Sequence, residues 1–245
     1  MMRILLVNDD GYNREGIRLL YKHLQKFGDV TLLAPLNHYS GTSASFTIDK
    51  PFTLAKYEEG IYSLDGSPVD CTLFGLCSGL FKPFDLVVSG CNDGLNLSYD
   101  IIYSGTIGAC SEAMVHHIPA IAFSTDFGHF KIVEKYFDEV FQFILDNNLI
   151  SKEYIINVNF PRHNFRKIKG IKLASLGMKE DTFTYANIDG KLMAVREENF
   201  EGAPRGTDVY LANKGYVSIV PIGPNAYHKD YLKALKSNMK KASNK

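Results

Sequence analysis

The chain has 245 residues, enough to bury a large core, and its 45% hydrophobic and 22% charged residues are ordinary for a soluble globular protein. Lysine plus arginine balances aspartate plus glutamate at 27 each, so no overall charge favours binding to nucleic acid or to an anionic membrane. No apolar run approaches the roughly 20 residues that a membrane span needs. The chain opens on strand-like residues without signal-peptide features, and its four cysteines form no C-x-x-C pair. We therefore expect a cytoplasmic protein with reduced, structural thiols.

Strand-like and helix-like patterns alternate through the first 160 residues. In chain order, they predict a strand at 3–7, a helix at 16–27, a strand at 30–34, two weaker strands at 46–55 and 61–64, a helix at 67–80, a strand at 85–89, a helix at 106–117, a strand at 120–124, a helix at 130–149 and a strand at 154–160. Such alternation predicts βαβ units, and therefore an α/β fold with a mostly parallel sheet and helices on both faces.

The pattern changes near Pro161. From there to about Pro221, strand and hairpin signals dominate, including an Asp189-Gly190 turn between two alternating runs. Apolar residues at helical spacing predict a final helix at 228–241, with its lysines on a solvated face. We expect an α/β domain over residues 1–160 and a β-rich extension with a terminal helix over 161–245, together forming one structural unit.

Three polar loops follow predicted strands, at residues 8–11, 37–45 and 90–106. The carboxyl ends of neighbouring parallel strands share one edge of a sheet, so these loops are expected to meet there. The first loop carries Asp9 and Asp10, whose charges repel unless a cation lies between them. Oxygen ligands of this kind suit Mg²⁺, Mn²⁺ or Ca²⁺. An ordinary acidic turn at Asp10-Gly11, with Asp9 capping the next helix, is an equally good interpretation of this stretch alone.

The loop at 90–106 is the most unusual segment, because it is rich in glycine and carries the amides of Asn92 and Asn96. Ser104-Gly105-Thr106 begins a predicted helix, whose free N–H groups suit a phosphate; simple capping of that helix is the alternative. The sequence contains no Walker A motif and no G-x-G-x-x-G, which disfavours ATP or NAD binding. A serine-hydrolase elbow and zinc-binding histidine spacings are also absent from the sequence.

Taken together, these motifs resemble the SurE family of survival proteins, the stationary-phase 5′/3′-nucleotidases. The matching motifs, which run in family order along nearly the whole chain, are Asn8-Asp9-Asp10-Gly11 with Gly16-Ile17, Ala34-Pro35, Ser40-Gly41, Asp70-Cys71, Ser89-Gly90-x-Asn92-x-Gly94-x-Asn96, Tyr103-Ser104-Gly105-Thr106, and Gly206-Thr207-Asp208 followed by GYVSIVPI.

The resemblance implies a Rossmann-like domain and a metal-dependent phosphomonoesterase that hydrolyses nucleoside 5′- and 3′-monophosphates, in some members also short polyphosphate. One Mg²⁺ or Mn²⁺ per subunit would be held by Asp9, Asp10, Ser40 and Asn92, with Asp9 and Asp10 catalytic. The residues implied for phosphate and substrate binding are Asn8, Asn96, Ser104, Gly105 and Thr106. The C-terminal region would join subunits into a homodimer or homotetramer, and no nucleic-acid or membrane partner is expected.

Two other functions are compatible with the same residues. One is a non-catalytic sensor of nucleotides or phosphate built on the same fold. The other is a glycosyltransferase that uses the paired aspartates for a nucleotide-sugar metal, which the missing D-x-D spacing disfavours. Within the nucleotidase interpretation, the identity of the general base and the formation of an aspartyl-phosphate are left open.

Overall fold

The computed structural model describes residues 1–223, and the helix expected at 228–241 lies outside them. Within this part, a nine-stranded sheet has the order β3-β4-β2-β1-β5-β6-β7-β11-β8. Its parallel centre consists of β1 (Met2–Val7), β2 (Gly28–Pro35), β4 (Ile61–Leu64), β5 (Leu86–Asp93), β6 (Ala120–Thr125) and β7 (Ile155–Asn159). At the edges, β3 (Leu54–Glu58) is antiparallel to β4, β11 (Val217–Ile222) is antiparallel to β7, and β8 (Ile171–Leu173) is parallel to β11. The predicted mostly parallel α/β sheet is confirmed.

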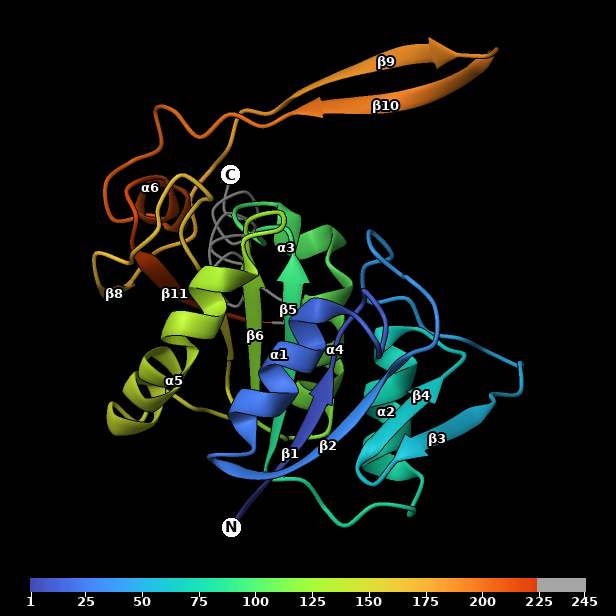
Figure 1. Cartoon of the computed structure of the whole chain (residues 1–245). Coiled ribbons are helices and arrows are strands. Elements are labelled where there is room, and N and C mark those ends of the chain that lie inside the picture. Colours follow the sequence, from blue (N-terminus) through green and yellow to red (C-terminus); the bar gives the residue numbers. More distant parts are fainter. Residues whose placement is uncertain (224–245) are drawn as a thin grey trace, which may run out of the picture.

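Helices cover both faces of the sheet (Figure 1). The helices α1 (Glu15–Leu24) and α5 (Phe130–Asp146) pack on one face, and α2 (Pro68–Cys77) and α4 (Gly105–Val115) pack on the other. In β1, Ile4 and Leu6 belong to the first of these cores, whereas Leu5 and Val7 belong to the second. Consecutive side chains of a strand point to opposite faces, which is why this doubly buried strand is apolar throughout.

Most expected elements are present within a few residues of their predicted bounds, but the strand expected at 46–55 is wrong over most of its length. Residues 46–53 form a loop, and β3 begins only at Leu54. The backbone N–H of Thr47 donates to Asp70, and that of Thr53 donates to Asp65. Side-chain carboxylates thus replace the strand partner that a β segment would need.

Two short helices have no counterpart among the predicted elements. They are α3 (Asp100–Tyr103), with 4 residues, and α6 (Asp208–Asn213), with 6 residues. Each is too short to show a repeating apolar pattern. All four cysteines of the sequence are free: Cys71, Cys91 and Cys110 are buried, and Cys77 is exposed.

The predicted hairpin is present as β9 (Thr182–Ile188) and β10 (Lys191–Glu197), and it projects from the rest of the chain (Figure 1). Its turn residues Asp189 and Gly190 have φ values of 51° and 78°, as a type I′ turn requires. Beyond Pro161, β8 and β11 continue the main sheet. No helix in residues 1–223 is both long enough and apolar enough to cross a membrane.

Candidate functional site

A pocket of about 550 Å³ lies at the carboxyl ends of the central strands. Six predicted site residues line it: Asp9, Asp10, Ser40, Asn92, Asn96 and Ser104. The other lining residues are His38, Gly41, Asp93, Gly94, Leu95, Asp100, Tyr103, Phe127, Arg196 and Glu198. A larger hollow of about 720 Å³ near Arg3 and Gly28, at the amino ends of β1 and β2, contains none of the predicted site residues.

The turn after β1 presents the two aspartates to the pocket. The Asn8 side-chain oxygen accepts a hydrogen bond from the Gly11 N–H at 3.1 Å, and Asn8 Nδ2 donates to the Gly11 carbonyl at 3.0 Å. Gly11 itself has a φ of 117°, which a side chain would strain. Asn8 is completely buried and does not line the pocket, so in this structure its amide shapes the turn that carries Asp9 and Asp10.

Asp9 packs against the start of α4. Its Oδ1 accepts a hydrogen bond from Thr106 Oγ1 at 2.7 Å, and a Cβ added to Gly105 would lie 2.8 Å from Asp9 Cβ. Burial raises the pKa of Asp9, and the Thr106 hydroxyl opposes that rise. Gly105 and Thr106 do not line the pocket. They contact Asp9 on the side away from the pocket and hold its carboxylate in place.

Asp10 is less enclosed. Its Oδ2 accepts a hydrogen bond from the Asp93 N–H at 3.3 Å, and its Oδ1 lies 3.6 Å from His38 Nδ1. Burial, and next the neighbouring charge of Asp9, raise the pKa of Asp10 to about 6. Asp9 and Asp10 therefore form an acidic pair of adjacent carboxyls with raised pKa values. A bound cation would stabilise the ionised form of both carboxyls.

Further oxygen donors lie beside this pair. Asn92 Nδ2 donates to the Gly94 carbonyl at 2.8 Å, which leaves the amide oxygen of Asn92 available to a ligand. The loop of Ser40 is tied to the aspartates, because the Tyr39 N–H donates to the Asp9 carbonyl at 2.7 Å. Within residues 1–223 no three His, Cys, Asp or Glu side chains converge as a metal-binding group. A cation here would depend on the hydroxyl of Ser40 and the amide of Asn92 as well as on the carboxylates.

Asn96 is held in place by the sheet. Its N–H donates to Asn159 Oδ1 at 2.8 Å, its carbonyl accepts from Asn157 Nδ2 at 2.9 Å, and its own Nδ2 donates to Ser124 Oγ at 2.9 Å. Asn157 and Asn159 were not among the predicted site residues. Two asparagines inside the apolar run YIINVNF are a signal that could have identified them, because a buried polar side chain needs a partner.

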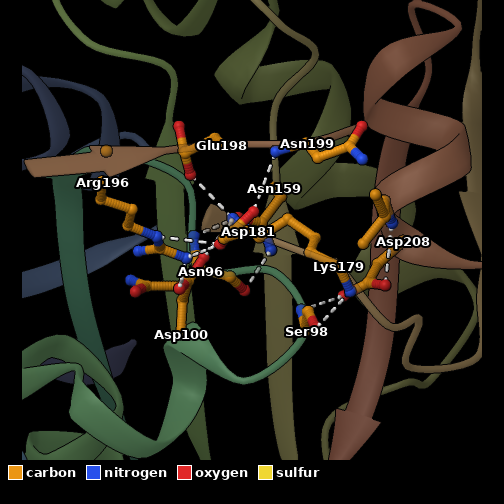
Figure 2. Close-up of polar contacts among 12 residues, drawn as sticks. Asn96, Ser98, Asp100, Asn159, Lys179, Asp181, Arg196, Glu198, Asn199 and Asp208 are labelled. Atoms are coloured by element: carbon orange, nitrogen blue, oxygen red, sulfur yellow. Dashed lines mark hydrogen bonds and ion pairs between the residues drawn. The ribbon is translucent and has the colours of Figure 1, made fainter. Parts of the chain in front are cut away.

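A second group of charged residues forms another part of the pocket wall (Figure 2). Asp100 comes from α3, and Arg196 and Glu198 come from the base of the hairpin. These three residues were not among the predicted site residues. Asp208, in the predicted motif Gly206-Thr207-Asp208, accepts a hydrogen bond through its Oδ2 from the Ser98 N–H at 3.1 Å. This motif therefore supports the loop that contains Asn96.

Fold and site together define a Rossmann-like α/β protein whose carboxyl-edge pocket offers hard oxygen donors beside a helix N-terminus. The family model of the survival protein SurE matches residues 4–182, and the chain belongs to this family. The 5′-nucleotidase SurE of Histophilus somni is 39% identical over 238 residues, which cover 93% of this chain and 95% of that protein. The corresponding protein of Clostridium beijerinckii is 36% identical, with coverages of 90% and 92%. The crystal structure of the SurE protein from Aquifex aeolicus superimposes with a TM-score of 0.82 at 34% identity, covering 97% of this chain and 99% of that one.

Proposed function

We propose that this chain is a divalent-metal-dependent 5′-nucleotidase, a phosphoric monoester hydrolase that converts nucleoside monophosphates, including 3′-monophosphates, to nucleoside and phosphate. Relatives named 5′-nucleotidase SurE over more than nine-tenths of the chain support this activity. The observation that carries the proposal is the acidic pair Asp9 and Asp10, presented on one turn to a pocket that Ser40 and Asn92 also line.

The donor set fits a hard divalent cation such as Mg²⁺ or Mn²⁺, held by Asp9, Asp10, Ser40 and Asn92. Such an ion, when bound, supplies a Lewis acid for a phosphate oxygen and lowers the pKa of a bound water. The protein contributes the orientation of its ligands. Thr106 holds one oxygen of Asp9, and the Gly94 carbonyl fixes the Asn92 amide.

The phosphate of the substrate would bind beside Asn96 and Ser104. Ser104 caps α4, and its Oγ accepts a hydrogen bond from the Ile107 N–H at 3.2 Å. The positive end of this helix faces the same region and would stabilise the charge that develops on the phosphoryl oxygens. A carboxylate of the acidic pair would accept the proton of the attacking water.

Two exposed aromatic side chains on the pocket wall favour a nucleotide over a smaller phosphate ester. Tyr103 is 63% exposed and Phe127 is 70% exposed, and both line the pocket. The Phe127 ring lies against Gly94, where an added Cβ would come within 3.2 Å of it. Exposed ring faces beside a phosphate site suit stacking on a nucleobase.

We also propose that the C-terminal region joins copies of the chain into a homodimer or homotetramer. The hairpin exposes large apolar side chains, including Tyr185 at 71% and Leu192 at 73%. Exposed apolar side chains gathered on one hairpin support an interaction surface there.

The activity is tested by measuring inorganic phosphate released from AMP and GMP with Mg²⁺ or Mn²⁺. We expect turnover by the native chain, and a loss of at least about 100-fold in kcat for Asp9→Asn and Asp10→Asn, because each change removes a ligand and a proton acceptor. Asp138→Asn is the matched control, since Asp138 lies on α5 and pairs with His23 and Lys26 away from the pocket.

Two results would contradict the proposal. Binding of AMP without turnover, under every metal condition, would assign the chain to the non-catalytic sensor class. Near-full activity of Asp10→Asn in chelator-treated buffer would show that the reaction needs neither the metal nor the Asp10 carboxylate. p-Nitrophenyl phosphate, which lacks a nucleoside, shows in parallel how much of the rate depends on the nucleoside.

A further inference from the structure

A lysine at the base of the hairpin is buried among carboxylates. The Lys179 side chain is 1% exposed, and its Nζ lies 2.7 Å from Asp100 Oδ2, 2.7 Å from Glu198 Oε1 and 3.6 Å from Asp181 Oδ2. A buried ammonium is unfavourable unless several acceptors surround it. The position of Lys179 therefore depends on these three carboxylates, and their positions depend on Lys179.

Arg196 completes this cluster from the end of β10. Its Nη2 donates to Asp100 Oδ1 at 2.5 Å, and its Nε donates to Asp181 Oδ2 at 2.9 Å. Both carboxylate oxygens of Asp100 thus bind cations from the hairpin base, as Figure 2 shows. We call Asp100, Lys179, Asp181, Arg196 and Glu198 the hairpin-base cluster.

The cluster acts on the loop at residues 94–104, which contains the proposed phosphate contacts Asn96 and Ser104. Asp100 begins α3, and α3 leads directly to Ser104. Lys179 also reaches this loop through its backbone, since its N–H donates to Ser98 Oγ at 3.1 Å. The loop is therefore held by the sheet near Asn96 and by the hairpin base near Ser98 and Asp100.

We propose that Lys179 and Arg196 are positioning residues for the reaction, which act through Asp100 to hold the 94–104 loop in the geometry that binds the phosphate. The inference rests on the proposed nucleotidase function. Within residues 1–223, neither cation forms a hydrogen bond or an ion pair with a proposed metal ligand. Loss of either would release the Asp100 end of the loop and leave the acidic pair in place.

Four variants test the inference. Lys179→Met removes the charge and keeps most of the unbranched side chain, and Arg196→Met removes the charge at a site that is 35% exposed and more tolerant of change. Arg196→Lys restores one cation beside Asp100. Lys26→Met is the matched control, because Lys26 forms an ion pair with Asp138 on a remote surface.

Two readouts are needed. Hydrogen–deuterium exchange by mass spectrometry should show faster exchange at residues 94–104 in both Met variants, with unchanged exchange in α5. Steady-state kinetics with AMP should show kcat/KM lowered about 10- to 100-fold, because small misplacements of substrate-binding groups have effects of this size. The midpoint Mg²⁺ concentration should stay within about threefold, and Arg196→Lys should recover most of the activity.

The two proposals fail in different ways. If the native chain hydrolyses no nucleotide, the proposed function fails, and the exchange measurement still shows whether the cluster holds the loop. Unchanged exchange at 94–104 in both Met variants would overturn the inference. It would also be overturned if both variants kept native kcat/KM per folded molecule while only their thermal stability fell, since that result describes a purely structural cluster. Arg196→Met keeps the test decisive if Lys179→Met does not fold.

Discussion

At the scale of single residues, the acidic pair Asp9 and Asp10 costs stability when it is ionised. Asp9 is 2% exposed, and its charged form is disfavoured by burial. The neighbouring Asp10 has its pKa raised by burial and by Asp9. A group whose pKa is raised on folding binds a proton more tightly in the folded than in the unfolded state. The metal-free protein therefore stores unfavourable electrostatic energy at the place where we propose that a cation binds.

The first prediction concerns pH and metal. The pKa of Asp10 rises from 3.8 to about 6 on folding, so its contribution favours folding fully below pH 3.8 and is lost as the pH rises through 6. The loss is on the order of 2–3 kcal/mol by pH 7.5. Added Mg²⁺ should therefore raise the Tm by several degrees at pH 7.5 and by much less at pH 5, where protons compete for the carboxylate.

Differential scanning calorimetry with and without Mg²⁺ at the two pH values measures this difference. Asp10→Asn should have a smaller Mg²⁺-dependent rise in Tm at pH 7.5, and Asp138→Asn should behave like the native chain. An equal rise in Tm at pH 5 and pH 7.5 would show that Asp10 is not a ligand.

At the scale of elements, the start of α2 supports two parts of the molecule. Ser67 Oγ accepts a hydrogen bond from the Asp70 N–H at 3.1 Å, and Asp70 Oδ2 accepts one from the Ser67 N–H at 2.7 Å, which together form a capping box. Asp70 also accepts from the Thr47 N–H at 3.0 Å and from Thr47 Oγ1 at 2.6 Å. One buried carboxylate therefore caps a helix and anchors the loop that follows Ser40.

The second prediction is that Asp70→Asn affects stability and metal binding together. An amide cannot accept all three of these N–H and O–H groups, since one of its ends is a donor. We expect the free energy of unfolding to fall by about 2 kcal/mol and Mg²⁺ affinity to fall about tenfold, as the Ser40 loop loosens. Urea denaturation and calorimetric metal titration measure the two effects.

Asp65→Asn is the control for this change. Asp65 accepts from the Thr53 N–H at 2.7 Å at an exposed place in the same loop. The Asp65→Asn substitution should lower the free energy of unfolding less than Asp70→Asn does, and it should leave Mg²⁺ affinity unchanged. If the Asp70→Asn protein binds Mg²⁺ with native affinity, the prediction is wrong, because the start of α2 would then not support the metal site.

At the scale of the whole molecule, the hairpin has no core of its own. Directly opposed residues share a face, so Tyr185 lies opposite Ala194, and Leu192 lies opposite Asn187, on one side of the hairpin. The other side presents Ile188, Met193 and Val195, which are 47%, 50% and 40% exposed. An isolated two-stranded hairpin is at best marginally stable in water. Contacts with another copy of the chain would bury these side chains.

The third prediction is that Tyr185→Asp combined with Leu192→Asp reduces the size of the assembly. Charges at these positions would be buried without partners in any interface that the hairpin forms. Light scattering after size-exclusion chromatography should report a multiple of 27.5 kDa for the native chain and a smaller multiple for the double variant. Leu80→Asp, which changes a side chain that is 66% exposed outside the hairpin, should have no effect on mass. A native chain that elutes with the mass of one subunit would contradict the proposed oligomer.

The sequence by itself determined those features that depend on neighbouring residues or on a regular spacing of apolar residues. These are the alternating strands and helices, the Asp189-Gly190 hairpin, the helix start at Ser67, and the family motifs with Asp9 and Asp10. It predicted that three loops meet at one edge of the sheet, because parallel strands end on the same side. Six of the residues predicted for the site do line one pocket.

Only the tertiary structure decided which distant side chains support that pocket. Lys179 meets Asp100 across 79 residues of chain, Arg196 meets Asp100 across 96, and Asp208 meets Ser98 across 110. It also placed β11 between β7 and β8. Such contacts have no local pattern in the sequence. They form because the folded sheet and the base of the hairpin remove these charges and amides from water, and each buried polar group must then find its partner wherever the fold provides one.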